Sequence, residues 1–349
     1  MSSKSQFFTE ILEQPATLRR LLSEGREPVQ KAAAKLKEFG PEWALIAARG
    51  SSDNAARYAQ YLLGAHNGLG VALAVPSLIS LYGATPRMGR AAVIGISQSG
   101  QSPDIVGVLS SAAKQGAVTI AVTNDPASPL AKASNATLPL LAGEEKGIAA
   151  TKTYTAQLLS LAMLSVALEG SAERQATLAQ VPGYVEQVIE SVQANVSEAA
   201  QGFAKAGKLV VLGRGFNYAT TFEVALKIKE TSYCVAEPYS IADLLHGPVA
   251  MIDQEFPVIV IAASGAALTD IPTLFDLLEK RGARTLAISD RPDVLSRAHF
   301  GLKLPSGVPE WLSPIVAVVA GQLFANALCL ASGQDPDKPR GLSKVTLTR

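Results

Sequence analysis

Hydroxyl and amide side chains gather in the segment SQSGQS at 97–102, between an apolar run at 91–96 and a helix-forming run at 105–114. In a strand–turn–helix unit, such a loop brings backbone N–H groups and the positive end of a helix to the carboxyl edge of a parallel sheet. A dianionic phosphate needs several convergent donors, and this loop supplies them without a metal or an arginine. The segment predicts an anion site, with an ordinary capped loop as the alternative. The candidate donors are Ser97, Gln98, Ser99 and Ser102.

A second polar loop, GSSDN at 50–54, follows the apolar run WALIAA at 43–48. It occupies the same topological position one unit earlier in the chain. Loops that follow neighbouring parallel strands can line one pocket. By itself the loop is equally typical of a helix cap.

Three charged residues, Glu223, Lys227 and Glu230, recur at a spacing that places them on one face of a helix. A carboxylate on this face would serve as a proton-transfer base if the face points into a cleft. A solvated stripe of charge is the competing interpretation. The spacing alone does not separate the two.

Two further residues are candidates through their chemistry and surroundings. His246 stands between apolar residues in LLHGPVAMI, whereas His66 and His299 lie in polar segments. A histidine in an apolar setting is either a structural residue or an acid–base group. Lys344 lies near the C-terminus, where a lysine is usually solvated, but a tail folded over a pocket would let its amine form a Schiff base with a sugar carbonyl.

Apolar runs alternate with helix-forming segments in both halves of the chain, which predicts parallel sheets covered by helices. The segments ALIAARGSSDNAARYAQYL and LVVLGRGFNYATTFEVAL share a strand, a glycine turn and a helix in the same order, which indicates a duplicated fold. The prediction is an α/β protein of two tandem domains. Its parts are a helical arm at 1–40, a first domain at 41–180, a helical connector at 181–204, a second domain at 205–334 and a tail at 335–349.

Composition limits the function classes. Hydrophobic residues make up 48% of the 349 residues and the net charge is +1, which supports large cores and gives no field for nucleic acid or a membrane surface. The two cysteines are predicted to be buried small hydrophobes, and neither a metal nor a cofactor is expected. The N-terminus lacks the features of a signal peptide, and the apolar stretch 312–330 contains Pro314, Gln322 and Asn326. We therefore expect a buried helix there and a cytoplasmic protein.

Taken together and in order, these blocks resemble the isomerase half of glucosamine-6-phosphate synthase and its stand-alone relatives, a family built from sugar isomerase (SIS) domains. The resemblance covers nearly the whole chain. It is carried by EILEQP, ARGSSDNA, ISQSGQSPD, AGEEKGIAATKTYTAQ, GRGFNYATTFEVALKIKETSY, AEPYSIADLLHGP and GLSKVT. It implies two tandem SIS domains.

The resemblance also assigns roles to residues. In the family the SQSGxS/T loop binds the sugar phosphate, and the loop after the first strand contacts the substrate through hydroxyls, here those of Ser51 and Ser52. The family's VAS loop corresponds to Ile148, Ala149 and Ala150, which keep the backbone contacts and lose the hydroxyl. The catalytic roles fall on Glu230 for proton transfer between C1 and C2, Lys227 facing the substrate, His246 for ring opening and Lys344 for the Schiff base.

The reaction is expected to differ from that of the synthase, because the chain starts directly at the isomerase half and has no glutaminase cysteine to supply ammonia. We expect an amino-sugar-6-phosphate deaminase that converts glucosamine 6-phosphate to fructose 6-phosphate and ammonia. A ketose–aldose isomerase and a fructosamine-6-phosphate deglycase are alternatives, and a non-catalytic sugar-phosphate sensor is a third. The resemblance also implies a homodimer in which His246 belongs to the neighbouring subunit's site.

Overall fold

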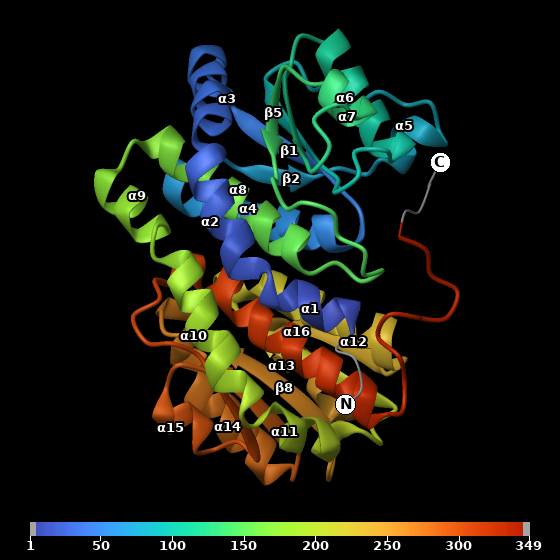
Figure 1. Ribbon diagram of the computed structural model, residues 1–349, viewed down its shortest axis with the longest axis vertical. Coiled ribbons are helices and arrows are strands. Elements are labelled where there is room, and N and C mark those ends of the chain that lie inside the picture. The colour runs from blue at the N-terminus through green and yellow to red at the C-terminus, as the bar shows by residue number, and fades with distance from the viewer. Residues whose placement is uncertain (1–4, 345–349) are drawn as a thin grey trace. The chain divides into compact units, whose positions relative to one another are not determined.

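Short apolar runs form two parallel sheets in the computed structural model, which describes residues 5–344 (Figure 1). Each sheet has five strands, in the orders β2-β1-β3-β4-β5 and β10-β9-β8-β6-β7. Every strand pair is parallel. The central strands are apolar along their whole length because helices cover both faces of each sheet, as in β3, whose six residues are all buried. The predicted α/β class and duplicated fold are confirmed.

The chain divides into two compact units, and each takes segments from several parts of the sequence. Among the described residues, the N-terminal unit comprises 16–145, 152–180 and 343–344. Its strands are β1 (Trp43–Ala47), β2 (Val71–Leu73), β3 (Ala91–Ile96), β4 (Val118–Thr123) and β5 (Ala136–Pro139). Its helices are α2 (Gln14–Glu24), which begins in the other unit, α3 (Arg26–Phe39), α4 (Gly50–Asn67), α5 (Ser77–Ser80), α6 (Pro103–Lys114), α7 (Pro129–Lys132), α8 (Lys152–Glu169) and α9 (Ala172–Leu178).

The C-terminal unit comprises 5–15, 146–151 and 181–342 among the described residues. Its strands are β6 (Lys208–Gly213), β7 (Val235–Ser240), β8 (Pro257–Ala262), β9 (Arg284–Ser289) and β10 (Phe300–Lys303). Its α-helices are α1 (Gln6–Leu12), α10 (Val181–Gln193), α11 (Val196–Phe203), α12 (Tyr218–Ser232), α13 (Ile241–Leu245), α14 (Ile271–Lys280), α15 (Pro292–Leu295) and α16 (Ser313–Ala331). Short 3₁₀ turns are η1 (Gly215–Asn217), η2 (Pro248–Met251), η3 (Ala266–Asp270) and η4 (Glu310–Leu312). The domain boundaries predicted from the sequence stay a prediction.

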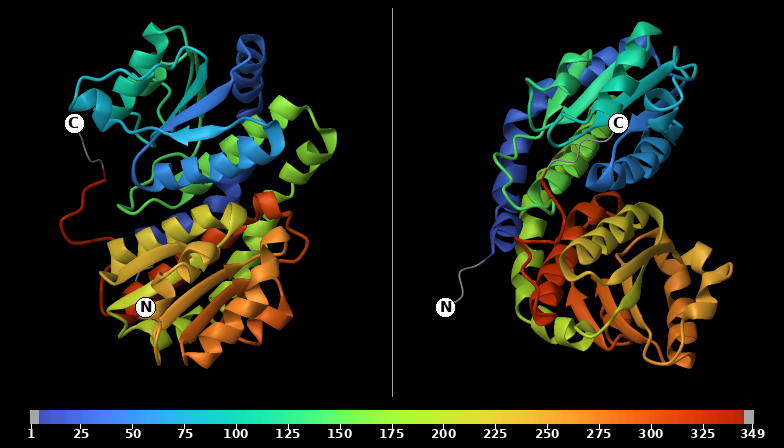
Figure 2. Two further views of the ribbon diagram at one scale, coloured as in Figure 1. Left: turned by 180° about the vertical axis from the view of Figure 1, so that it is seen from behind. Right: turned by 90° about the vertical axis from the view of Figure 1, so that its right-hand side faces the viewer.

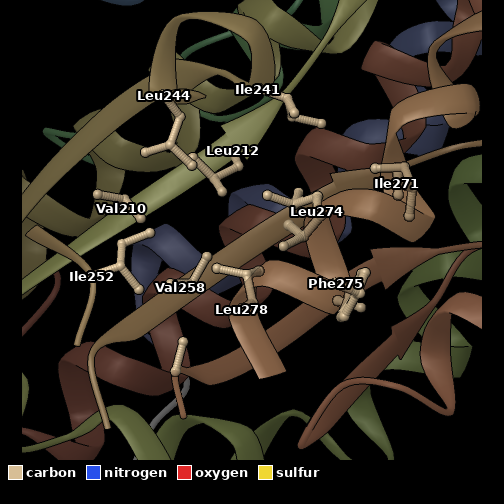
Figure 3. Packing of buried hydrophobic residues seen from close by; sticks show 14 of the residues in the cluster. Val210, Leu212, Ile241, Leu244, Ile252, Val258, Ile271, Leu274, Phe275 and Leu278 are labelled. Atoms are coloured by element: carbon tan, nitrogen blue, oxygen red, sulfur yellow. The ribbon is translucent and has the colours of Figure 1, made fainter. Parts of the chain in front are cut away.

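Each unit is a three-layer sandwich with a separate core. In the N-terminal unit, α6 and α7 pack on one face of the sheet, and α3, α4 and α8 pack on the other. In the C-terminal unit, α13, α14 and α15 cover one face, while α10, α11, α12 and α16 lie on the other. Figure 3 shows Leu274, Phe275 and Leu278 of α14 against Val210, Leu212 and Val258 of the sheet. Figure 2 shows two further views of the helices that flank each sheet.

The duplication extends to a pair of matching ion pairs. Arg49 directly follows β1, and its Nε lies 2.8 Å from Oδ2 of Asp104 in the first turn of α6. Arg214 directly follows β6 and pairs in the same way with Asp270, the N-cap residue of α14. In both sheets the pair ties the loop after β1 or β6 to the start of the helix that follows the neighbouring strand, β3 or β8. The two halves therefore share a detail of loop anchoring as well as the order of their elements.

Three of the edge strands were not predicted by the sequence pattern. The strands β2, β7 and β10 were not foreseen, and all three lie at or next to loops with exposed residues. Each forms an edge of its sheet. An edge strand is only partly buried, so it lacks the continuous apolar run that marks a central strand. The strand β7 even contains Pro238.

The most apolar helix of the chain belongs to the core. The segment Glu310–Ala331 is long and apolar enough to cross a membrane, but most of it is buried inside the protein. Gln322 and Asn326 are among its buried residues. The predicted buried helix at 312–330 is thus confirmed. The two cysteines are also buried, as expected.

We predict that both thiols react slowly with a thiol reagent in the native protein. Burial raises the pKa of Cys234 to about 11 and that of Cys329 to about 12, so thiolate is scarce at neutral pH. Relative to an unfolded thiol with a pKa of about 8.5, the thiolate fraction falls by roughly two and a half to three and a half orders of magnitude. Labelling kinetics at pH 7 in buffer and in denaturant measure the ratio. Equal rates in both would contradict the buried placement.

Candidate active site

The predicted anion loop at 97–102 joins β3 to α6 at the carboxyl edge of the first sheet. The backbone N–H of Gly100 donates to Oγ of Ser97 at 3.1 Å, and that of Gln101 donates to Oγ of Ser99 at 3.3 Å. A hydroxyl that accepts in this way keeps its own O–H hydrogen for another partner. Ser102 is the N-cap residue of α6 and stands at the positive end of the helix dipole. The loop therefore leaves hydroxyl hydrogens available for a further acceptor.

Gly100 sets the shape of this loop. Its φ is +63°, and a Cβ atom there would collide with the side chain of Ser128. Glycine has no Cβ and adopts this left-handed conformation without strain. The tight turn directly follows Ser97 and Ser99, and Ser97 is buried.

The second predicted loop forms the first turn of α4 (Gly50–Asn67). Ser52 is buried, and its Oγ accepts a hydrogen bond from Nε2 of Gln157 at 2.9 Å. Ser51 is half-buried. The Arg49–Asp104 ion pair connects the start of α4 with the start of α6, so the structure brings these two loops together at one sheet edge.

The charged face of α12 is a buried ion cluster. Nζ of Lys227 lies 2.6 Å from Oε2 of Glu230 and 3.4 Å from Oε1 of Glu223. The side chains of Lys227 and Glu223 are 1% and 0% exposed, whereas 24% of the Glu230 side chain is exposed. A buried ammonium is stable only when charge partners replace water. This arrangement excludes the solvated stripe that the spacing left open.

Within this cluster Glu230 alone reaches solvent. Its Oε2 is buried against Lys227, so the 24% exposure of the side chain comes from its other atoms. Although Oε2 satisfies no hydrogen-bond geometry, its 2.6 Å separation from the ammonium defines an ion pair. A carboxylate fixed at one oxygen and accessible at its other atoms has the properties that a general base needs.

Lys344 ends the described part of the tail. Its Nζ lies 2.6 Å from Oε2 of Glu145, whose side chain is fully buried. Glu145 also accepts hydrogen bonds from the N–H of Thr153 at 3.1 Å and from its hydroxyl at 2.8 Å, at the start of α8. Lys344 is therefore bound to a buried carboxylate that Thr153 holds in place. Its role in a Schiff base stays a prediction, and tail residues 345–349 lie outside the described residues.

The tail before Lys344 is anchored twice in the C-terminal unit. The carboxylate of Asp337 accepts hydrogen bonds from the N–H groups of Gln6 and Phe7 at 2.7 and 2.9 Å. The guanidinium of Arg340 lies 3.7 Å from the ring centroid of Tyr233, whose hydroxyl accepts a hydrogen bond from the Arg340 N–H. Tyr233 is the C-cap residue of α12, the helix of the charged cluster. The tail is therefore attached to this helix through the contact of Arg340 with Tyr233.

The remaining predicted residues are placed as follows. His246 is the C-cap residue of α13 and is exposed, so the structure does not support the structural alternative of a buried histidine. Its predicted role at a subunit boundary is untested. Ile148, Ala149 and Ala150 form a loop of the C-terminal unit between Gly147 and α8. Sequence reasoning missed Glu145, because a carboxylate in the segment AGEEKG carries no spacing signal that separates it from its neighbour Glu144.

In the second domain, the N–H groups of the equivalent loop are bonded to the carboxylate of Glu310. The segment after β8, at 263–270, corresponds in topology to the loop at 97–102 after β3. There the N–H groups of Ala266 and Ala267 donate to the carboxylate of Glu310 at 2.9 and 3.2 Å. These donors are already bonded to an anion that belongs to the chain. The two sheets therefore share an architecture but offer different loops to a ligand.

Comparison with known proteins agrees with this architecture. The SIS domain model matches residues 41–167 and 202–331. A glutamine–fructose-6-phosphate aminotransferase [isomerizing] of Aquifex aeolicus is 34% identical over 341 residues, which cover 96% of this chain and 56% of the relative. The structure of a candidate phosphosugar isomerase from Silicibacter pomeroyi DSS-3 is 33% identical, with a TM-score of 0.87 and coverage of 96% of this chain and 100% of that one.

The C-terminal domain of glucosamine-fructose-6-phosphate aminotransferase from Francisella tularensis matches with 25% identity and a TM-score of 0.86, over 97% of this chain and 99% of that domain. The chain belongs to the SIS-domain family and contains two copies of the domain. It is homologous to the isomerase domain of glutamine–fructose-6-phosphate aminotransferase. It spans 56% of the length of the Aquifex relative.

We predict that Lys227→Met lowers the free energy of unfolding by about 3–5 kcal/mol, the usual effect of removing one partner from a buried ion pair. Two carboxylates would then share a buried site without a cation. Urea unfolding followed by circular dichroism measures the change. Lys229→Met, an exposed position on the same helix, is the matched control and should stay within about 0.5 kcal/mol of wild type. Similar values for both variants would refute a stabilising role for the ammonium.

Proposed function

We propose that this protein is a phosphosugar isomerase that deaminates an amino-sugar 6-phosphate, converting glucosamine 6-phosphate to fructose 6-phosphate and ammonia. The ring opens to the aldehyde, and a base removes the proton from C2 while the C1 oxygen gains a proton. Reprotonation at C1 leaves a C2 imine, which water hydrolyses to the ketone and ammonia. The SIS family membership and the homology to an aminotransferase isomerase domain support the reaction class.

The observation that carries the proposal is the exposure of Glu230 beside the buried Lys227. Moving a proton between adjacent carbons needs one base that can take the proton from one carbon and return it to the next. A carboxylate held at one oxygen by an ammonium keeps its position through both steps. Glu223, which is fully buried on the other side of Lys227, holds the ammonium in place.

The serine loop is proposed to bind the substrate phosphate. Hydroxyl donors of Ser97, Ser99 and Ser102 and the positive end of α6 provide the interactions that an anion needs. A sugar phosphate bound by its phosphate needs few further contacts to orient the reacting carbons. Ser51 and Ser52 are proposed to contact the sugar from the start of α4, and Lys344 to approach its carbonyl carbon.

The preference for an amino sugar rests on the relatives. The curated relatives are aminotransferases that act on fructose 6-phosphate and isomerise it, according to their names. By microscopic reversibility, a site that stabilises the transition state for placing nitrogen at C2 also stabilises the one for removing it. Isomerisation without amine loss would use the same Glu230 chemistry. We further propose a cytoplasmic homodimer in which His246 assists ring opening in the neighbouring subunit's site.

We predict that Glu230→Gln lowers kcat for ammonia release by about two to four orders of magnitude, as expected for loss of a general base. The amide keeps the size of the side chain and removes the basic oxygen. Ammonia is measured after incubation with glucosamine, galactosamine and fructosamine 6-phosphates, and fructose 6-phosphate is measured as the second product from glucosamine 6-phosphate. Glu237→Gln, an exposed position in the same unit, is the control and should retain wild-type turnover. Fructose 6-phosphate is also supplied alone, and an aldose product without ammonia from any amino sugar would assign plain isomerisation instead.

We predict that Ser97→Ala and Ser99→Ala mainly raise KM, by about tenfold each, because loss of one hydrogen bond to a charged group removes about 1.5 kcal/mol of binding shared by ground and transition states. Steady-state kinetics separate KM from kcat. Ser23→Ala, at an exposed serine of the same unit, should change neither. Unchanged KM in both loop variants would refute the phosphate assignment and leave the role of Glu230 standing.

A further inference from the structure

A buried carboxylate outside the proposed catalytic groups holds the loop at 146–151. Glu10 lies on α1 and is fully buried. Its Oε1 accepts the N–H of Lys146 at 2.5 Å, and its Oε2 accepts the N–H of Gly147 at 3.1 Å. Nε2 of Gln6 donates to Oε1 at 2.9 Å. A carboxylate without water is stable here because three donors surround it.

The contact is close enough to require glycine. A Cβ atom at position 147 would lie 2.7 Å from Oε2 of Glu10. Any other residue would therefore push the carboxylate away from the backbone. Glu10 supplies the acceptor, and the missing side chain of Gly147 leaves room for the carboxylate to reach the backbone.

The helix that carries Glu10 is itself immobilised. Phe7 and Ile11 of α1 are fully buried, and α1 packs on α16. Its first N–H groups are capped by the carboxylate of Asp337. Glu10 is therefore a fixed point from which a neighbouring loop can be positioned.

The other end of the loop is held by a chain of amides. Nε2 of Gln14 donates to Oε1 of Gln322 at 2.9 Å, and Nε2 of Gln322 lies 3.4 Å from the carbonyl oxygen of Thr151. Both amides are buried. The loop is thus fixed at residues 146–147 and at residue 151. Within residues 5–344, the three positions between these anchors form no hydrogen bond; they are Ile148, Ala149 and Ala150.

We propose that Glu10 is a positioning residue that sets the backbone of 148–150 for contact with the sugar. The inference rests on the proposed function, because it assigns those backbone groups to the sugar phosphate substrate. Backbone donors bind a sugar hydroxyl well only when their direction is fixed before binding. Glu10 supplies that direction through the two N–H groups directly before this segment.

The test uses Glu10→Gln in the full-length protein. Glutamine has one acceptor oxygen and an NH₂ group that would face the Gly147 N–H, so the 3.1 Å contact at the Oε2 position is lost and only the longer 3.3 Å contact to the remaining oxygen can be kept. We expect the amides of Lys146 and Gly147 to exchange with solvent about tenfold to a hundredfold faster, as for loss of a hydrogen bond to a charged group. We expect KM for glucosamine 6-phosphate to rise by about tenfold to a hundredfold, the range for small misplacement of a binding group. Inhibition by inorganic phosphate should stay at the wild-type constant, because the serine loop is intact.

Two control pairs separate positioning from loss of folding. Glu24→Gln removes an exposed carboxylate from the helical arm and should leave exchange and KM unchanged. Gly147→Ala disturbs the same contact from the loop side and should also raise KM. Gly183→Ala adds a methyl group into open space and should leave KM unchanged. A variant that was merely less stable would lose active protein while the remaining fraction kept its KM.

The outcomes are distinct. Wild-type KM in Glu10→Gln, with an active wild-type enzyme, would overturn the positioning role whatever the exchange shows. Unchanged exchange at 146–147 would overturn the clamp itself. Failure of the proposed function is recognised separately, because wild type and Glu24→Gln would then both fail to convert any of the sugar phosphates tested.

Discussion

The ammonium of Lys227 is the charge on which the proposed chemistry depends. It lies on a helix that packs against a sheet and α16, its side chain is buried, and it forms ion pairs with Glu223 and Glu230. In such a setting the positions of the three groups are coupled, since moving one carboxylate removes part of the charge that compensates the buried ammonium. The position of Glu230 is therefore fixed by packing as much as by its own rotamer. A base held in this way is ready before the substrate arrives.

Backbone N–H groups in the loops also need partners, in their case hydrogen-bond acceptors. Backbone N–H groups that leave a sheet edge or precede a helix must find acceptors, and in this protein side-chain oxygens supply them. Serine hydroxyls serve at 97–102, the carboxylate of Glu10 at 146–147 and the carboxylate of Glu310 at 266–267. The choice of acceptor decides what each loop offers. A hydroxyl that accepts a backbone N–H still has a hydrogen to donate to a ligand. An ionised carboxylate has none, so it only fixes the backbone.

Duplication supplied two similar sheets, and the loops made them different. Both halves keep an arginine after β1 or β6 and an aspartate at the start of the helix that follows the neighbouring strand. The first half places three serines in the loop at 97–102, whereas Ser264 in the equivalent loop of the second half is bonded to Asp290. The second half contributes the charged helix α12 instead. Equal folds thus carry unequal chemistry, because function resides in the few residues at the strand ends.

The sequence by itself determined the central strands, the long helices and the polar loops, because continuous apolar runs and glycine–serine turns are local signals that do not depend on distant partners. It also determined that Glu223, Lys227 and Glu230 share a face, since helical spacing is fixed. Only the tertiary structure decided that this face is buried, that Lys344 meets Glu145, and that Glu10 reaches the backbone at 146–147. Those contacts join residues far apart in the chain, and no local pattern encodes which distant group will satisfy a buried charge.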